Sequence, residues 1–322
     1  MSVERRSLRR HSGAFASVAL VVTWSSGFIG AELSARAGAA PLTVLAWRFL
    51  LLAGALLVAC GATRTSLRSW ESWRRQAVLG AFCQAGYLIF VFEGISNGVH
   101  GGTASLIGAM QPLLVATVAG RLLGERSSPV MWFGMALGLA GVTVVVSGDL
   151  GTGGAPIWAF ALPAAGMVSL AAGTLLTRRL RPRETILQSI TMQAVITAAF
   201  TMAAAALTGH AAPPAHLDAW IAIGWLIVLA SLGGYALYVF VTRTLGATAV
   251  STLLYLTPPT TMLWAFLMFG EPITVAGIVG LLISAAGVAL VLRGQRAVLA
   301  GQRVRSHALT LAAQDEALSA RR

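Results

Sequence analysis

The chain contains no lysine: all 23 of its basic residues are arginine, and they face only 11 acidic residues. Charged residues make up 11% of the 322 residues, whereas 57% are hydrophobic, and the mean hydropathy is +0.77. This composition leaves too little polar surface to cover a soluble globule of this length. The sequence therefore argues against a soluble domain and predicts a protein of the lipid bilayer.

Cysteine and histidine are also scarce. The two cysteines, Cys60 and Cys83, fall in apolar stretches, so neither a disulfide nor a cysteine metal site is expected. The five histidines lie in predicted loops or tails, without metal-ligand spacing or a nucleophile beside them. The sequence has no Walker-type phosphate loop, which argues against direct drive by ATP. We expect no catalytic residue, no metal and no cofactor.

Long apolar runs dominate what remains. Ten of them reach the roughly 20 residues needed to cross the hydrocarbon core. They are residues 14–33, 41–61, 77–97, 103–121, 129–147, 156–177, 185–208, 219–241, 247–269 and 273–292. Each should be an α-helix, because an isolated strand cannot satisfy its backbone in lipid. For the first run a cleaved signal peptide is the alternative, although the run is longer than such peptides usually have.

An internal repeat organises these spans. Residues 102–146 recur in register at 248–292, and each matching pair is 146 residues apart, as in Pro112 with Pro258 and Gly141 with Gly287. The repeating unit holds five spans, and an odd number makes the second copy enter the bilayer upside down. The predicted fold is an all-α integral membrane protein with ten transmembrane helices as two inverted five-helix repeats. The parts are 1–13 (cytoplasmic N-terminal segment), 14–147 and 156–292 (repeats) and 293–322 (cytoplasmic tail, an amphipathic helix or disordered).

The arginines fix the predicted orientation. With the N-terminus in the cytoplasm, 21 of them fall inside, Arg36 falls outside and Arg48 lies within a span. This asymmetry predicts a multi-pass protein of the plasma membrane with both termini cytoplasmic. It also accounts for the net charge of +12, so we expect the lipid bilayer, and no nucleic acid, as a partner.

Several short patterns carry a family resemblance. They are Trp24-Ser25-Ser26-Gly27-Phe28 in the first span, Pro41 followed by Arg48-Phe49 in the second, and a proline followed after eleven residues by Gly-Glu at the end of the fourth and ninth spans. Together they resemble the EamA-type branch of the drug/metabolite transporter superfamily over residues 14–292. The resemblance implies a secondary carrier that exports amino acids, other metabolites or drugs through a central cavity between the halves.

Much stays open at this point. The resemblance does not name the small-molecule substrate, the direction of transport or the coupling ion, for which the proton is one option. The protein could be a monomer or a homodimer. A membrane-embedded enzyme or assembly factor without transport activity is the alternative function.

The predicted cargo site rests on helix breaks and aromatic faces. Pro112, Pro258 and Pro259 interrupt the fourth and ninth spans and free backbone carbonyls near the middle of the bilayer. Tyr235 and Tyr238 share one face of the eighth span, and Tyr87 lies on the equivalent face of the third. Packing alone could also explain these residues. The predicted lining is Trp24, Gln84, Tyr87, Gln111, Tyr235, Tyr238 and Tyr255.

Ionisable residues inside a bilayer are costly and therefore candidates for function. Arg48, Glu93 and Glu32 lie within the predicted spans, and an ion pair of Arg48 with Glu93 or Glu32 is geometrically feasible. A structural pair, a cargo or proton site, and a side chain that reaches the interface all stay open. Glu125 and Glu271, at the ends of the fourth and ninth spans, are interpreted as boundary caps or loop anchors, with proton carriers as the alternative.

Small residues predict close helix contacts. Gly134 and Gly138 form a GxxxG pattern in the fifth span, and Gly280 and Ser284 keep the same spacing in the tenth. In the sixth span, small residues four apart predict another close approach; they are Ser169, Gly173 and Thr177.

Overall fold

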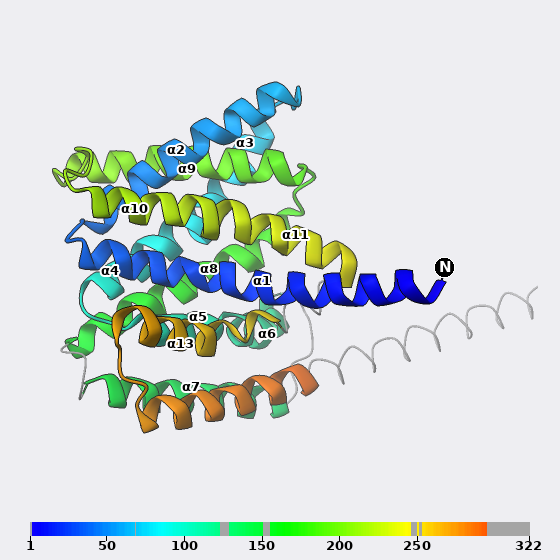
Figure 1. The fold of residues 1–322 in the computed structure, drawn as a ribbon, viewed down its shortest axis with the longest axis vertical. Helices are drawn as coiled ribbons and strands as arrows, with labels where there is room; N and C mark the ends of the chain where they lie inside the picture. Colours follow the sequence, from blue (N-terminus) through cyan, green and yellow to red (C-terminus); the bar gives the residue numbers. More distant parts are fainter. Residues whose placement is uncertain are drawn as a thin grey trace, which may run out of the picture.

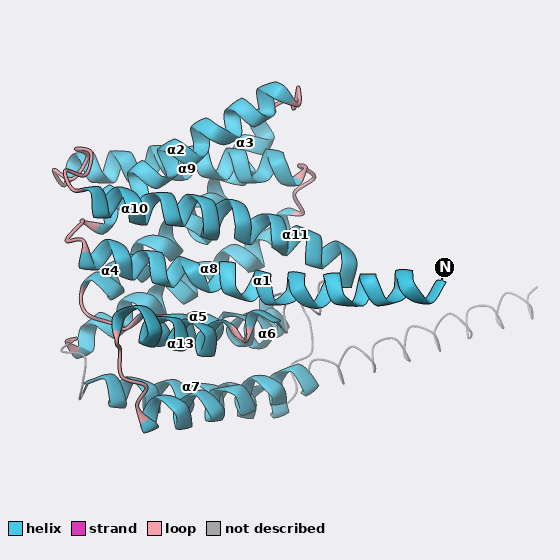
Figure 2. Ribbon diagram, viewed as in Figure 1, coloured by secondary structure: helices cyan, strands magenta, loops and turns pink. Residues whose placement is uncertain are grey.

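The computed structural model describes residues 2–67, 69–122, 129–150, 155–245, 250 and 253–294, and the regular elements among them are helices (Figure 2). The first half contains α1 (Ser2–Arg36), α2 (Pro41–Ala62), α3 (Trp70–Gly80), the π-helix η1 (Ala81–Gly86), α4 (Tyr87–Ser96), α5 (Gly101–Ala109), α6 (Gln111–Leu122) and α7 (Pro129–Leu150). The second half contains the 3₁₀-helix η2 (Ile157–Phe160), α8 (Ala161–Leu180), α9 (Ile186–Leu207), α10 (Leu217–Trp225), the π-helix η3 (Leu226–Gly233), α11 (Gly234–Leu245), α13 (Thr257–Phe269) and a last helix, Val275–Gly294. The predicted tail and Glu125 lie outside the described residues, apart from the last residues of the final helix.

Helix ends follow local chemistry. Pro41 begins α2, where its missing N–H would have had no helical partner. A capping box begins α9, because the Gln188 amide donates to Thr185 Oγ1 (3.3 Å) and the Thr185 amide donates to the Gln188 side chain (2.8 Å). Gly270 ends α13 at a φ of +70°, a left-handed conformation that favours glycine.

In the part of the chain that the structure describes, eight helical segments are long and apolar enough to cross a membrane, compared with the ten predicted over the whole sequence. The predicted span 103–121 is not among the eight, because its described apolar helix, Gly101–Ala116, is too short. This helix is also interrupted at Met110, two residues before Pro112, which separates α5 from α6. The predicted span 247–269 lies partly outside the described residues, and its described helix, α13, begins just before Pro258. In both places proline removes a helical hydrogen bond and shortens the continuous helix.

The two halves of the chain pack against each other helix by helix. α2 packs along α9, α4 along α8 and α5 along α13, while α1 packs against α10, η3 and α11. In Figure 1, α2 and α9 form one edge of the bundle, and α7 forms the other with the last helix, drawn in orange. An apolar core that includes Leu45, Phe49, Phe92 and Ile223 lies where α2, α4, α9 and α10 meet. The core is therefore shared between the halves.

Hydrogen bonds show that α2 and α9 run antiparallel. Near the start of α2, Thr43 Oγ1 donates to the His210 carbonyl (2.7 Å), just beyond the end of α9. Beyond the end of α2, the Ser66 carbonyl accepts from Gln188 Nε2 (2.8 Å) in the first turn of α9. We call the end with loops 63–69 and 181–185 the arginine-rich end, and the end with loops 37–40, 97–100, 208–216 and 270–274 the Arg36 end.

Small residues let helix backbones touch. A Cβ added to Gly287 would lie 2.5 Å from the Gly134 carbonyl oxygen, and Ser284 Oγ donates to the Gly138 carbonyl (3.2 Å). Both spans thus use their small residues for helix contact, as predicted, and the structure adds that they contact each other. The close approach predicted for the sixth span is also confirmed, because Ser169 Oγ donates to the Phe82 carbonyl (2.8 Å) in η1 and Gly173 lies directly against Cys83.

Both π-helical segments interrupt the third long helix of their half. At the ends of η1 and η3 stand Gly86 and Gly233, where a Cβ would lie 3.0 Å from the Ala81 carbonyl oxygen and 3.1 Å from that of Val228, five residues earlier. Glycine relieves this crowding in the wide turn. π-Helical turns are rare and often accompany functional sites.

Candidate functional site

Three of the predicted cargo residues form an aromatic row between α1 and α11. The Trp24 ring stacks on Tyr238 with centroids 5.7 Å apart, and Tyr238 lies 6.3 Å from Tyr235 in turn. Trp24 remains 36% exposed, so the row is open on one side. Such a row offers flat apolar faces together with two phenolic hydroxyls.

Arg48 is buried beside η3. It is 6% exposed, its Nη2 donates to Ser231 Oγ (3.1 Å), and Ser231 Oγ in turn donates to the Leu226 carbonyl (3.0 Å). Its Nε and Nη1 have no hydrogen-bond partner among the described residues. The predicted ion pair of Arg48 with Glu93 or Glu32 does not form within the described chain; Glu32 pairs with Arg36 instead.

The other predicted cargo residues take separate partners. Gln84 Nε2 donates to Gln193 Oε1 (3.0 Å) on α9, and Gln111 Nε2 donates to Thr174 Oγ1 (2.9 Å) on α8. The Tyr87 hydroxyl lies beside Gly108 of α5. Tyr255 packs against the apolar cluster that includes Met110. Pro112 lies in the first turn of α6, and Pro258 and Pro259 lie in the first turn of α13.

A ladder of polar side chains joins α3 and η1 to α9. From the arginine-rich end inward, Gln76 Nε2 donates to Glu184 Oε2 (3.2 Å), and Gln193 Nε2 donates to Gln76 Oε1 (2.7 Å). Gln84 continues the ladder from Gln193, and Thr197 Oγ1 donates to Gln84 Oε1 (3.4 Å). Polar groups thus lead from the loops into the bundle between the two halves.

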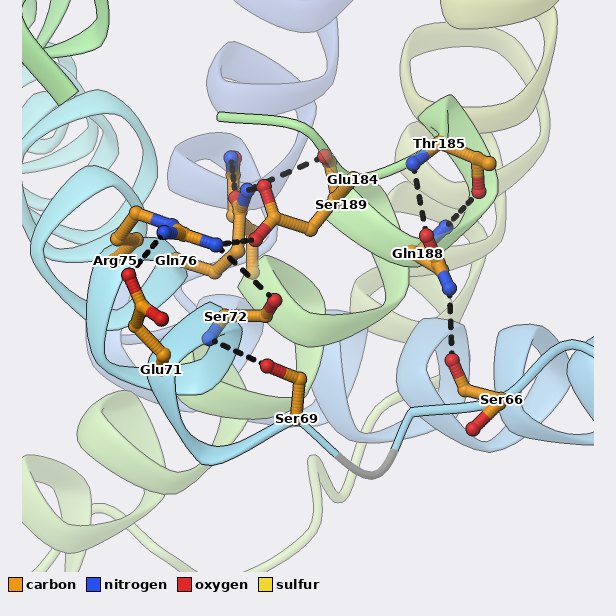
Figure 3. Close-up of polar contacts among 11 residues, drawn as sticks. Ser66, Ser69, Glu71, Ser72, Arg75, Gln76, Glu184, Thr185, Gln188 and Ser189 are labelled. Atoms are coloured by element: carbon orange, nitrogen blue, oxygen red, sulfur yellow. Dashed lines mark hydrogen bonds and ion pairs between the residues drawn. The ribbon is translucent and has the colours of Figure 1, made fainter. Parts of the chain in front are cut away.

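The arginine-rich end is closed by Arg75 and Glu184 (Figure 3). Arg75 Nη2 lies 2.9 Å from Glu184 Oε1, and Arg75 Nη1 lies 2.6 Å from Glu71 Oε1. Burial alone would raise the pKa of the Glu184 carboxyl, but hydrogen bonds from Ser72, Arg75, its own backbone and Gln76 lower the pKa to about 2. Glu184 is therefore an anion that ties the start of α9 to α3.

Two acidic groups meet at the Arg36 end. Arg36 Nη2 lies 2.9 Å from Glu32 Oε1 and 3.5 Å from Glu271 Oε1, so one guanidinium serves two carboxyls. Glu32 Oε2 is buried without a hydrogen-bond partner among the described residues. Gly270 turns the chain so that Glu271 reaches back to α1, which gives the second Gly-Glu pair a physical role beyond that of a boundary cap.

A second pair lies close by. His100 Nδ1 is 3.3 Å from Asp149 Oδ2, and Thr103 Oγ1 donates to the same oxygen. The hydrogen bond to Asp149 raises the pKa of His100 above its ordinary value of 6.5, although burial works in the opposite direction. Glu93, near the end of α4, is half-buried.

Sequence reasoning missed several of these groups. Asp149 lies beyond the predicted end of the fifth span at residue 147, but α7 continues through Leu150 and buries it. The polar ladder had a signal: Ser189, Gln193, Thr197 and Thr201 recur every four residues along the predicted span 185–208, which marks one polar helix face. No pattern in the sequence marks Ser231, because the direction of its side chain depends on the π-helical turn of η3.

Within the described ranges, no group of three or more His, Cys, Asp or Glu side chains comes together to hold a metal ion. The site instead consists of an aromatic row, a buried cation and polar ladders between two packed halves of a bundle with eight membrane-length helices. These features define a multi-pass membrane protein of the transporter class.

The chain belongs to the EamA-like transporter family, which matches residues 11–147 and again residues 157–293. This confirms the resemblance drawn from the sequence motifs. The two matches are separated by residues 148–156.

Two similar proteins refine the comparison. A protein of Streptantibioticus cattleyicolor described as a "Probable terminal-alkyne amino-acid exporter" is 26% identical over 290 residues, which are 89% of this chain and 95% of that protein. A solved crystal structure of a protein superposes with a TM-score of 0.59 at 22% identity, over 89% of this chain and 98% of the other. The second likeness concerns the fold alone.

Proposed function

We propose that the protein is a secondary exporter of the plasma membrane that carries small metabolites, above all amino acids or related compounds, by alternating access. The observation that carries this proposal is the pairing of the two halves. In chain order, α1 corresponds to α8, α2 to α9, α4 to α10–α11 and α5 to α13. If each helix is replaced by its counterpart, the contacts α2–α9 and α5–α13 stay the same, and the contact α4–α8 becomes the contact of α10–α11 with α1. A bundle of this kind can open at either end by equivalent movements.

The direction of the helices supports inverted repeats. α2 and α9 are the second helices of their halves, and their hydrogen bonds place them antiparallel. Loops at equivalent places in the two halves therefore lie at opposite ends of the bundle. We retain ten membrane helices, with α5–α6 and the segment ending in α13 as the broken fourth and ninth, and with both termini and the arginine-rich end in the cytoplasm.

Cargo binds between the halves in this proposal. The aromatic row of Trp24, Tyr235 and Tyr238 provides the apolar surface, while Gln84, Tyr87, Gln111 and Tyr255 line the paths on either side. Amino-acid export is supported by the name of the relative at 26% identity. Export of drugs is the second possibility within the family description, and the flat aromatic faces of the row would suit such compounds too.

The Arg36 end is our candidate for coupling to protons. Glu32 and Glu271 share the single guanidinium of Arg36 and lie close enough to interact with each other. Two carboxyls that share one cation favour retention of one proton between them. Release of that proton when the end opens to water would link proton movement to cargo movement.

Transport in liposomes tests the proposal. Purified protein in liposomes loaded with unlabelled L-propargylglycine, a terminal-alkyne amino acid, should take up the labelled compound by counterflow, and protein-free liposomes should not. An enzyme or assembly factor would move neither this compound nor a panel of other amino acids, metabolites and cationic drugs. Absence of flux for the whole panel, in protein that is folded and correctly inserted, would overturn the proposal.

A further inference from the structure

Arg48 brings a permanent positive charge into the bundle on α2. Arg48 is only 6% exposed. Two of its three guanidinium nitrogens, Nε and Nη1, are buried without a hydrogen-bond partner in the described chain. Its neighbours are Ser231, which accepts one hydrogen bond, and the Phe49 ring, whose centroid lies 5.1 Å from the guanidinium carbon. Neither carries a negative charge.

Nearby carboxylates do not neutralise this charge. Glu32 pairs with Arg36 at 2.9 Å, and no described carboxylate, Glu93 included, forms an ion pair with Arg48. A buried charge without a counter-ion is strongly unfavourable in a bilayer, and residues of this kind mark sites for ligands or ions. The missing partner is an anion.

The surroundings of Arg48 narrow the kind of anion. Ser231, its hydrogen-bond partner, lies about one turn before Tyr235, and Tyr235 begins the aromatic row that continues through Tyr238 to Trp24. A ligand bound at Arg48 therefore has flat apolar surfaces close by. A small molecule with one carboxylate and an uncharged side chain fits both features, because guanidinium N–H groups match carboxylate oxygens.

Among the described residues, the second half has no counterpart of this site. At the equivalent place on α9 stands Gln193, whose amide already bonds with Gln76 and Gln84. The second half thus offers a satisfied neutral group where the first offers an unsatisfied cation. One carboxylate would bind per transport cycle, despite the two-fold arrangement of the helices.

We infer that Arg48 binds the carboxylate of the cargo and that the aromatic row of Trp24, Tyr238 and Tyr235 holds its side chain. The inference rests on the proposed export function and names the substrate class: α-amino acids or other small monocarboxylates with an apolar or weakly polar side chain. The hydrogen bond to Ser231 holds the guanidinium against the π-helical turn while the remaining N–H groups point to the ligand.

The test compares an acid with its amide. Counterflow in liposomes is measured with L-propargylglycine and with propargylglycinamide, which lacks the carboxylate. The protein should prefer the acid by at least about tenfold, equivalent to roughly 1.4 kcal/mol, and Arg48→Gln should abolish the preference. Arg48→Lys keeps the charge without the planar fork and should retain a reduced preference. Arg64→Gln, the same change at an exposed arginine just beyond the end of α2, is the matched control and should keep the preference.

The results of this experiment distinguish amino-acid export from carboxylate recognition by Arg48. Protein that moves neither compound contradicts amino-acid export itself. Protein that moves acid and amide equally, or an Arg48→Gln variant that still prefers the acid, overturns carboxylate recognition and leaves export intact. Melting curves of each variant report folding; if Arg48→Gln does not fold, the preference of Arg48→Lys decides, and a value equal to that of the unmodified protein overturns the inference.

Discussion

Single polar residues in this bundle find their partners in the opposite half of the chain. Gln76 of α3 accepts from Gln193 of α9, Arg75 pairs with Glu184, and Arg48 donates to Ser231 of η3. Each helix satisfies its own backbone, so these side chains do not hold the helices themselves together. A substitution at one of them should therefore loosen the contact between halves while leaving the helical content intact.

Glu184→Gln should remove an acid-sensitive part of the stability. The pKa of Glu184 is lowered from 4.5 to about 2 in the folded protein, so its contribution is fully present above 4.5 and is lost as the pH falls toward 2. The melting temperature of the unmodified protein should fall across that interval, and the variant should start lower and show less of this fall. Tryptophan fluorescence in detergent would measure the melting temperature at each pH. Glu71→Gln, at a side chain that is 78% exposed, is the control and should behave like the unmodified protein; identical curves for all three would contradict the assignment.

Tyr235→Ala should weaken cargo binding without unfolding the protein. The substitution removes one ring of the aromatic row, and aromatic pairs contribute about 0.5–1.5 kcal/mol beyond burial, which predicts roughly two- to tenfold weaker binding. Concentration-dependent counterflow in liposomes would measure it. Tyr235→Phe keeps the ring and should stay close to the unmodified protein. Loss of folded protein in Tyr235→Ala would instead assign the residue to packing.

Among the elements, α7 and the last helix have the closest backbone contact described here. Their spacing of small residues was visible in the sequence, because Gly134, Gly138, Gly280 and Ser284 follow a rule that depends only on helix geometry. The π-helical turns were not, since η1 and η3 lie inside uninterrupted apolar runs whose composition is the same for α- and π-turns. Positions that depend on those turns, such as Ser231, could not be predicted either.

Gly287→Ala should destabilise the pair of helices. The added Cβ would lie 2.5 Å from the Gly134 carbonyl oxygen and 2.5 Å from the Gly138 nitrogen, and backbone atoms cannot rotate away. Overpacking of this kind costs about 1–3 kcal/mol, measurable as earlier unfolding in a denaturant or thermal series. Gly54→Ala on α2 has no atom within 4 Å of the new Cβ and should be neutral. Equal stability of the two variants would refute the close contact.

For the whole molecule, the sequence was sufficient to predict the class and the family, because hydropathy and the short motifs are properties of the chain alone. It also predicted that Tyr235 and Tyr238 share a helix face, which periodicity reveals; their role in cargo binding stays a prediction. Contacts between side chains of helices far apart in the sequence could not be predicted from the sequence. The pairing of Glu271 with Arg36, and of Asp149 with His100, depends on how α1, α5 and α7 meet at one end of the bundle.

The proposed orientation predicts which loops face the cytoplasm. In a background with both native cysteines replaced by alanine, a cysteine at Thr65 should react with a membrane-impermeant thiol reagent only after the cells are opened. One at Ala212, at the Arg36 end, should react in intact cells. Mass-shift labelling on gels would record both. The reverse pattern would invert the topology, and reactivity of both sites in intact cells would refute opposite ends.

The pairing of every long helix with a helix of the other half has a consequence for how the protein is made. The membrane receives residues 1–150 first, and at about 5–20 residues per second the ribosome needs roughly 10–30 s more to deliver their partners. Until then Arg48, Gln76 and Gln84 are without the groups that satisfy them here. The first half alone should be short-lived in cells, whereas residues 1–150 and 155–322 produced together as separate chains should protect each other. Pulse-chase lifetimes would measure this, and a first half that persists alone would show that it folds unaided.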